Sequence, residues 1–438
     1  MQTVDEFKKL LTQFVACKSI STDPAFAPEI TKTVNWLKQL FTQHGFDVET
    51  FNGPSCNPIV LAHLTTHNSL PTVLVYGHYD VQPADRSDSW NSDPFSLVSK
   101  AGRLWGRGVL DNKGQVLIHI FSVLQLIKQQ KLALNVKFLI EGNEETSNPD
   151  LPGIMRKNKT KLKSDYVLVS DGELVGDSPV IESSLRGGFN LTLKYTTAAN
   201  NLHSGLAGGA VPNAALELSS FLSTLPKFTR LYQDVDPITS AQKANNRQLL
   251  KISANPLEIF GVKKLLMEPG LNVYTQTGLR PTLQITGLKS GYIDAGYANI
   301  VPATAEARIN FRIVASQRPK DILALFKKFV AQHTPKYVKY EITSAGIHNP
   351  VKLNTSQPIF KSVADILTRV YGQKPLLKYV GGAIPFISDV KATFGTDTIS
   401  VPFGNEDCNM HGANENFRLD LIKKGLAFSH HFFSSDKI

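Results

Sequence analysis

The chain lacks the features that would assign it to a disulfide-rich, secreted or membrane class. Its 438 residues include only three cysteines, Cys17, Cys56 and Cys408, which lie far apart in the sequence. So few cysteines, and an odd number, argue against a disulfide framework or a thiolate zinc site. The sequence has no run of 18 apolar residues that could span a membrane, and its first residues do not resemble a secretory signal. We therefore expect a cytoplasmic protein that has no membrane partner.

A concentrated basic surface is also missing, although the formal net charge is +10. The basic residues are scattered, and their densest run, Arg156–Lys163, has no interleaved aromatic residues. Nucleic-acid binding is therefore not expected. The composition, with 42% hydrophobic and 19% charged residues, is that of an ordinary globular protein. The length predicts two domains.

Short apolar segments alternate with helical patterns, such as Gln115–Gln129. This alternation predicts an α/β domain built on a mostly parallel sheet. The expected strands are Thr72–Tyr76, Val136–Ile140, Tyr166–Val169 and Thr398–Val401. Ligands bind at the carboxyl ends of such strands, so reactive residues found there indicate one site. They are His78, Asp80, Glu144, Glu145, Asp171 and, some residues further on, His411.

The middle of the chain follows a different order, β-α-β-β-α-β, which is that of the ferredoxin-like motif. The expected elements are strand Phe189–Tyr195, helix Val211–Leu225, strands Thr282–Ile285 and Ala305–Val314, helix Pro319–Gln332 and strand Val338–Thr343. We predict that residues 186–350 form a domain inserted into a catalytic domain of residues 1–185 and 351–438. Residues 227–278 have no firm assignment and are expected to be irregular or lid-like.

Three motifs suggest metal chemistry, although each has an ordinary structural interpretation. Asp80 can fix the second ring nitrogen of His78, which makes His78 a good zinc ligand. Asp111, between glycines at the start of a helix, is either an N-cap or a carboxylate that bridges two metals. Glu144 and Glu145 would repel each other unless a dication lies nearby. One of them could then bind metal while the other moves protons.

Asp171 and His411 complete the set, although alone they would be a turn residue and a loop histidine. Two histidines and three carboxylates suit zinc, with manganese or cobalt as alternatives, and leave a position open for water.

With these motifs in order along nearly the whole chain, the sequence resembles the co-catalytic zinc exopeptidase family. That family includes carnosinases, cytosolic dipeptidases, aminoacylases, succinyl-diaminopimelate desuccinylases and glutamate carboxypeptidases. The resemblance is strongest to the dipeptidase branch. It is carried by Gly77–Pro83, by the stretch from Ser89-Trp90 to Trp105–Gly108, and by Leu202–Gly205. The resemblance implies a zinc-exopeptidase-like catalytic domain with an inserted ferredoxin-like lid that often dimerises.

The same resemblance implies roles for the metal-site residues. His78 and Asp171 would bind one zinc ion, Glu145 and His411 the other, and Asp111 would bridge them. Glu144 would be the general base for a water shared by the two ions, and Asp80 would orient His78. His203 would reach the active site of a partner subunit and stabilise the oxyanion, which implies a homodimer.

The resemblance also implies the substrate-binding residues, with two departures. Arg312 would bind the substrate carboxylate, since a guanidinium fork matches a carboxylate. Asn299 and the loop with Gly382 and Ala383 would lie near the substrate. Ala383 stands where dipeptidases have Ser or Thr, so one hydroxyl is lost. Asn201 replaces the usual Asp, which leaves the substrate identity open.

Hydrolysis of dipeptides or short peptides is therefore the expected function. An N-acyl amino acid deacylase with the same site is the nearest alternative. An inactive binding protein on the same fold is the alternative from another class, and it is disfavoured because every ligand position and the general base are present.

Overall fold

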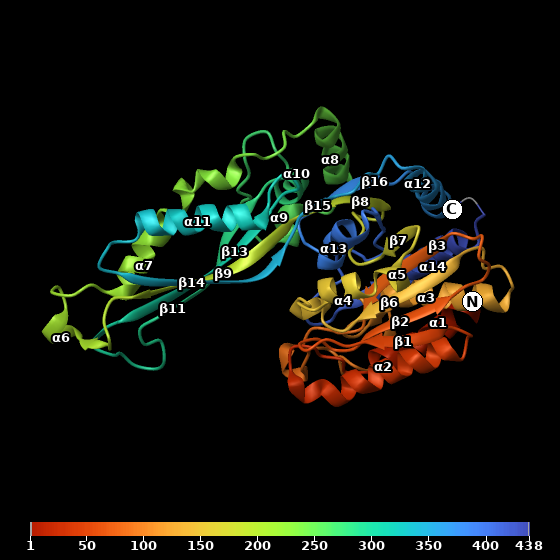
Figure 1. Cartoon of the computed structure of the whole chain (residues 1–438), viewed down its shortest axis with the longest axis horizontal. Helices are drawn as coiled ribbons and strands as arrows, with labels where there is room; N and C mark the ends of the chain where they lie inside the picture. Colours follow the sequence, from red (N-terminus) through yellow and green to blue (C-terminus); the bar gives the residue numbers. More distant parts are fainter. Residues whose placement is uncertain (1, 437) are drawn as a thin grey trace.

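A nine-stranded mixed sheet organises the catalytic domain of the computed structural model, which describes residues 2–436 and 438 (Figure 1). Its order is β1-β2-β6-β3-β7-β17-β8-β15, and β16 also pairs with β8. The four central strands β6, β3, β7 and β17 are parallel, so their carboxyl ends share one edge of the sheet. The strands are β1 Asp47–Phe51, β2 Ile59–Leu64, β3 Thr72–His78, β6 Asn135–Glu141, β7 Tyr166–Val169, β8 Val180–Leu185, β15 Val351–Lys352, β16 Leu376–Val380 and β17 Thr398–Ser400.

Helices cover both faces of this sheet because its central strands are apolar on both sides. In β3, Val73 and Val75 belong to one hydrophobic core, while Leu74 and Tyr76 belong to a second one. The first core takes in helices α1 Gln2–Val15, α2 Ala27–Thr42, α3 Lys113–Lys128, α12 Pro358–Tyr371 and α14 Leu419–Phe433. The second takes in α4 Leu151–Lys157, α5 Lys159–Leu162 and α13 Pro385–Phe394. The sheet is thus held rigidly between two helical layers.

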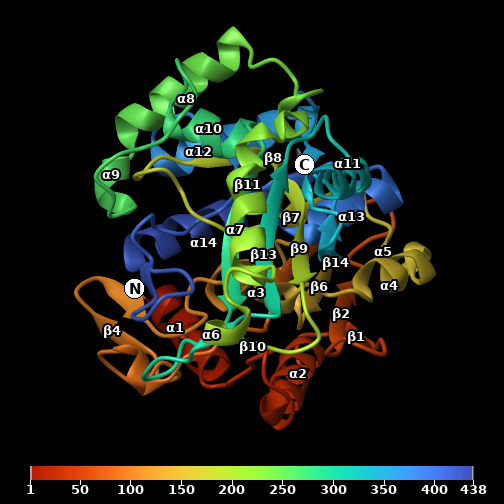
Figure 2. The ribbon, with the colours of Figure 1, turned by 90° about the vertical axis from the view of Figure 1, so that its left-hand side faces the viewer.

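The inserted domain is a four-stranded antiparallel sheet that carries two helices on one face (Figures 1 and 2). The strand order β11-β13-β9-β14 and the chain order β-α-β-β-α-β confirm the ferredoxin-like prediction. The elements are β9 Gly187–Thr196, α7 Ala214–Ser223, β11 Thr282–Ser290, β13 Thr304–Ile313, α11 Pro319–His333 and β14 Lys339–His348. We propose residues 186 and 350 as the domain boundaries, because they fall between β8 and β9 and between β14 and β15.

Residues 227–278, which were expected to be irregular, contain three helices. They are α8 Ser240–Ile252, α9 Pro256–Ile259 and α10 Val273–Leu279. In α8 only Asn246 and Leu249 are buried, so the segment has no apolar stripe from which a helix could be inferred. The local signal was instead a capping box between Thr239 and Gln242 at its start. Both α8 and α10 pack against β16 of the catalytic sheet.

Shorter elements complete the fold. They are β4 Val98–Lys100, β5 Arg103–Trp105 and β18 Asn416–Arg418 in one small sheet, β10 Leu202–His203 and β12 Ile300–Val301 in another, and α6 Ser204–Ala207. Across residues 2–436 and 438, no helix combines the length and the apolar character needed to cross a bilayer. The cytoplasmic location stays a prediction.

Phe326→Ala tests whether the inserted domain has its own core. Phe326 is fully buried and packs against the rings of Phe221, Phe228 and Phe311. The cavity left by the truncation should lower the free energy of unfolding by about 3–5 kcal/mol, measured by denaturant titration. The exposed Leu216 on α7 is the control, and Leu216→Ala should change it by less than about 0.5 kcal/mol. Equal effects of the two variants would contradict this description of the lid core.

Candidate metal centre

The five predicted metal ligands converge at the carboxyl edge of the central parallel strands. His78 ends β3, and Glu145 lies in the short turn after β6. Asp171 follows β7, and Asp111 comes directly before the N-cap of α3. His411 lies in the loop before β18. The architecture therefore brings together residues that are up to hundreds of positions apart in the chain.

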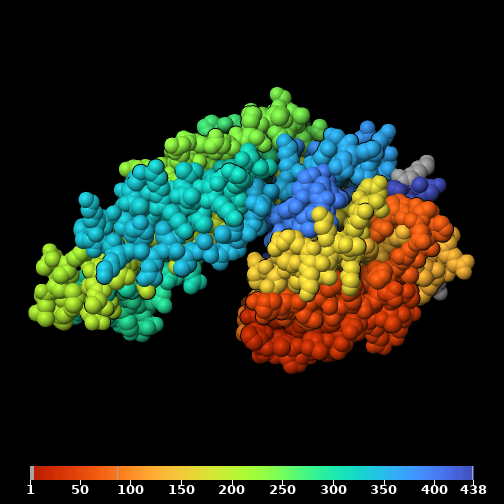
Figure 3. Space-filling model, in the orientation of Figure 1, coloured from red at the N-terminus to blue at the C-terminus, as the bar shows by residue number. Residues whose placement is uncertain are grey.

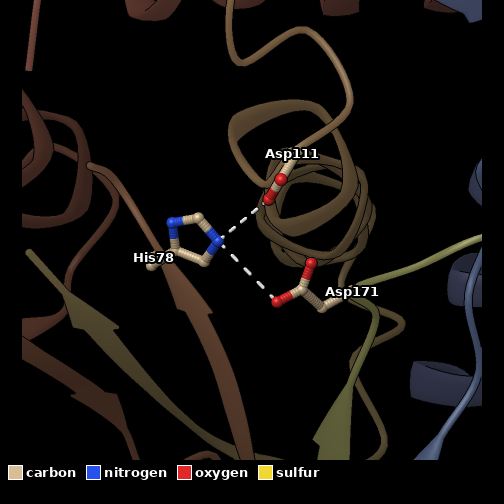
Figure 4. Close-up of side chains that lie close together, drawn as sticks. All are labelled: His78, Asp111 and Asp171. Atoms are coloured by element: carbon tan, nitrogen blue, oxygen red, sulfur yellow. Dashed lines mark hydrogen bonds and ion pairs between the residues drawn. The ribbon is translucent and has the colours of Figure 1, made fainter. Parts of the chain in front are cut away.

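The ligands form two groups that share Asp111, as Figure 4 shows for the first group. The Nε2 atom of His78 lies 3.1 Å from Oδ1 of Asp111 and 3.7 Å from Oδ2 of Asp171. The Nε2 atom of His411 lies 2.9 Å from Oδ2 of Asp111 and 3.1 Å from Oε2 of Glu145. Each Asp111 oxygen thus faces a different group. Two cations that share one carboxylate fit this donor set.

Asp80 orients His78 and also fixes the turn that carries Glu144 and Glu145. The Nδ1 atom of His78 lies 3.0 Å from the carbonyl oxygen of Asp80 and 3.3 Å from its carboxylate. A proton held on Nδ1 leaves the Nε2 lone pair free for a metal. The Asp80 carboxylate accepts the backbone N–H groups of Glu144 and Glu145, both at 3.2 Å, and the Ser21 hydroxyl at 2.7 Å.

Glu144 belongs to neither ligand group, but it shares their electrostatic environment. Desolvation raises its pKa well above the ordinary value; His78 opposes this shift, and the carboxylates of Asp171, Glu145 and Asp111 add to it. Desolvation, followed by the charge of Asp111, also raises the pKa of Asp171 to about 7. So many carboxylates at close range repel one another, and bound dications would relieve that repulsion.

A buried ion pair that sequence reasoning missed holds the Asp111 segment. Glu415 is fully buried and pairs with Arg107 at 3.0 Å. Its carboxylate also accepts the backbone N–H groups of Gly108 and Leu110, both at 2.9 Å, and of Asp111 at 3.1 Å. These bonds fix the backbone on which the bridging carboxylate stands. The only sequence signal was the position of Glu415 four residues after His411.

The Arg107 side of this pair extends to the other ligand loops. Its guanidinium donates to the backbone carbonyls of Pro83 and His411, at 3.3 and 3.2 Å. It also lies over the Trp90 ring, 5.3 Å from the centroid. One buried guanidinium therefore links the loop after β3, the Asp111 segment and the His411 loop.

Arg312 lies on the lid sheet, in the same row as His348, which sequence reasoning also missed. Both residues pair with Gly188, Arg312 from β13 and His348 from β14, so their side chains are on one face of the sheet. Phe311, next to Arg312, points to the helix-covered core. The Nε2 atom of His348 is buried and has no hydrogen-bond partner among the described residues. The Nδ1 atom of His348 donates to the Gly346 carbonyl at 2.8 Å, and desolvation lowers the pKa of the ring, so the guanidinium of Arg312 is the group in this row that suits an anionic partner.

Gly382 and Ala383 lie in the loop between β16 and α13, at the base of the lid. His203 and Asn299, by contrast, are not near the metal centre of the same chain. His203 is exposed and immediately precedes α6, and the Ser204 N–H donates to the Asn299 carbonyl at 2.9 Å. α6 lies at the end of the lid far from the catalytic domain (Figures 1 and 3).

This fold and these ligand groups define a metal-dependent hydrolase with an inserted lid domain. The chain belongs to peptidase family M20/M25/M40, whose family model matches residues 74–435. It is 27% identical over 466 residues to the Beta-Ala-His dipeptidase of Mus musculus, a match that covers 99% of this chain and 93% of that protein. The Cys-Gly metallodipeptidase of Schizosaccharomyces pombe is also 27% identical, over 96% of this chain and 94% of its own length.

Solved structures agree with this assignment. An M20 family metallo-carboxypeptidase from Sulfolobus solfataricus superposes with a TM-score of 0.88 and 27% identity, covering 98% of both chains. Human carnosine dipeptidase 1 has the same fold, with a TM-score of 0.84 and 24% identity over 98% of this chain and 96% of its own. The predicted family and fold class are confirmed, and the chain is a metallopeptidase.

Glu415→Gln should weaken metal binding although Glu415 is not a ligand. Removing the charge leaves Arg107 without its buried partner and loosens the Asp111 segment, so metal affinity should fall by roughly 10- to 100-fold. Titration against a chromogenic chelator measures this change.

Asp407→Asn is the matched control. Asp407 is an exposed carboxylate of the same loop, paired with Arg103. Its substitution should leave the metal affinity within about twofold of wild type, since exposed pairs contribute little. Equal metal affinity in wild type and Glu415→Gln would contradict the positioning role.

Proposed function

We propose that this protein is a two-metal dipeptidase of the exopeptidase type. The observation that carries the proposal is the pair of ligand groups sharing Asp111, with the free carboxylate of Glu144 beside them. Relatives that match nearly the whole chain are named as dipeptidases, one for Beta-Ala-His and one for Cys-Gly. Both names support short peptides as substrates.

The chemistry divides between the metals and the side chains. Two zinc ions, or manganese or cobalt in their place, supply Lewis acidity that acidifies a water and polarises the scissile carbonyl. His78 and Asp171 would hold one ion, Glu145 and His411 the other, and Asp111 both. Glu144 accepts the proton of the attacking water and returns it to the leaving amine. Bound dications would offset the neighbouring carboxylates that raise the pKa of Glu144, which would leave it ionised and able to take that proton.

The lid supplies the recognition of the substrate. Arg312 would bind the terminal carboxylate, which makes the enzyme an exopeptidase for short substrates. Gly382 and Ala383 would contact the substrate near this site. Ala383 has no hydroxyl group with which to form a hydrogen bond to it. An N-acyl amino acid deacylase would use the same carboxylate site, so a panel of dipeptides beside N-acetyl and N-succinyl amino acids separates the two functions.

We further propose that the active enzyme is a homodimer in which His203 and Asn299 serve the partner's site. The Nδ1 atom of His203 accepts the Gly205 N–H at 3.0 Å, so a neutral His203 carries its proton on Nε2 and can donate to an oxyanion. Leu206, Ile293 and Tyr297 are almost fully exposed near this end of the lid. β11 is an edge strand of the lid sheet, which pairs only with β13 among the described strands. Apolar residues and an open edge on one end support burial against a second copy.

Glu144→Gln should separate catalysis from metal binding. The variant should lose roughly 10²–10⁴ in kcat, the usual contribution of general acid–base catalysis. Elemental analysis should still find two metal ions per chain. Glu145→Gln is the contrasting variant, because it removes a ligand and should lower the metal content. Normal turnover in Glu144→Gln, or active protein without a transition metal, would overturn the proposed mechanism.

Subunit mixing tests the in-trans role of His203. Glu144→Gln and His203→Ala should each be nearly inactive, since losing one oxyanion donor costs roughly 10²–10³ in turnover. A mixed dimer has one site with an intact Glu144 and the partner's intact His203. Random exchange makes half the dimers mixed, so activity should return to about a quarter of wild type. A fully active His203→Ala homodimer, or no recovery after confirmed exchange, would contradict the role.

A further inference from the structure

Arg186 stands at the point where the chain passes from the catalytic sheet to the lid sheet. β8 ends at Leu185 and β9 begins at Gly187, so Arg186 is the single residue between them. The return of the chain to the catalytic domain lies against the same point. A Cβ added to Gly187 would be 2.2 Å from the backbone nitrogen of Pro350. The outgoing and returning crossings are therefore in backbone contact beside Arg186.

The backbone and side chain of Arg186 both hold the glycine-rich loop after β16. Its N–H donates to the carbonyls of Gly382 and Val380, at 3.1 and 3.3 Å. Its Nε–H donates to the Gly381 carbonyl at 2.8 Å. Its Nη1 donates at 3.1 Å to the carbonyl of Arg280, which lies two residues before β11 of the lid. Arg186 thus connects the loop that carries Gly382 and Ala383 with two entry points into the lid sheet.

The charge of Arg186 is partly buried beside a second partly buried arginine, Arg312. Neither Arg186 nor Arg312 forms an ion pair with a carboxylate of the described residues. Desolvation, followed by the positive charge of Arg312, lowers the pKa of Arg186 to about 10. Desolvation also lowers the pKa of Arg312. Two desolvated charges of one sign are costly, and an anion bound between them would be stabilised by both.

We propose that Arg186 is a positioning residue for recognition of the substrate carboxylate. It holds the Gly381–Ala383 loop against the base of the lid, and its positive charge adds to that of Arg312. Binding of the carboxylate compensates this charge, so it also tightens the contact between loop and lid. The inference rests on the proposed function. None of the hydrogen bonds of Arg186 named above goes to a metal ligand.

The experiment compares a dipeptide with its C-terminal amide, which lacks the charge that Arg186 would help to bind. kcat and KM are measured for both substrates with wild type, Arg186→Gln, Arg186→Lys and Arg312→Gln. Arg280→Gln is the matched control. This arginine lies at the other lid entry, but its side chain pairs with Glu268, and only its backbone carbonyl contacts Arg186.

In Arg186→Gln, kcat/KM for the dipeptide should fall by about 10- to 100-fold, as expected for lost bonds to a charged group. kcat/KM for the amide should fall less than about threefold by the same reasoning, because no carboxylate is present to be recognised. Arg186→Lys keeps the charge and should recover part of the preference for the dipeptide. Arg280→Gln should match wild type on both substrates.

If the role of Arg186 were purely structural, Arg186→Gln would lower kcat/KM equally for the dipeptide and for its amide. That result would overturn the inference. Equal preference for the dipeptide in Arg186→Gln and Arg186→Lys would also overturn it, because the charge would then be irrelevant. If Arg312→Gln loses the preference while Arg186→Gln keeps it, the proposed function stands and the inference fails. If wild type does not hydrolyse dipeptides, the proposed function fails and takes the inference with it.

Hydrogen exchange on the wild-type protein tests the same point without a variant that must fold. Alanine, at a concentration that inhibits hydrolysis by at least about half, should slow exchange of the backbone amides at 186 and 380–383, since a bound carboxylate stabilises the loop contacts. Alaninamide at the same concentration should leave the exchange of these amides unchanged, because it has no carboxylate. Unchanged exchange with alanine would overturn the inference.

Discussion

The buried ion pair between Arg107 and Glu415 is the interaction on which the geometry of the metal centre depends. Glu415 binds the backbone before and at Asp111, and Arg107 binds the carbonyls of Pro83 and His411. The two side chains are almost entirely excluded from solvent. A buried pair is a poor source of net stability, because desolvation offsets the Coulomb attraction. It nevertheless fixes three loops relative to one another, which a site of five ligands from five separate segments requires.

Two regions of the active site each carry an excess of charge that the described chain does not neutralise. Around Asp111 the excess is negative, and dications would neutralise it. At the base of the lid the excess is positive, since Arg186 and Arg312 lie close together without a carboxylate partner in the described chain. The carboxylate of a short peptide would neutralise that excess. In the proposed function, the scissile carbonyl of a peptide would lie at the first and its carboxylate at the second.

The separation of these charges follows from the two-domain architecture. The metal ligands stand on the rigid parallel sheet, whereas Arg312 and His348 stand on the lid sheet beside the crossings. The lid reaches far beyond the catalytic domain (Figure 3), and it carries exposed apolar residues and the edge strand β11. The end of the lid that carries α6 lies far from the catalytic domain of the same chain, which agrees with its proposed use in a homodimer.

The sequence by itself determined the elements and most of the metal centre. Buried strands such as Tyr166–Val169 are continuous apolar runs, and parallel strands carry their ligands at one shared edge, so His78, Glu145, Asp171 and, further on, His411 could be assigned to one place. Asp111 was added through its position between glycines at a helix start and through the family resemblance. α8 could not be found in this way, because it buries only two residues of its thirteen. Only the tertiary structure shows which residues contact Glu415 and His348, because the sequence does not indicate the partners of these side chains. Glu415 lies 308 positions from Arg107, and His348 meets Arg312 only across the side-chain-free Gly188. Such contacts depend on how loops and strands pack in three dimensions, and sequence periodicity carries no information about that packing.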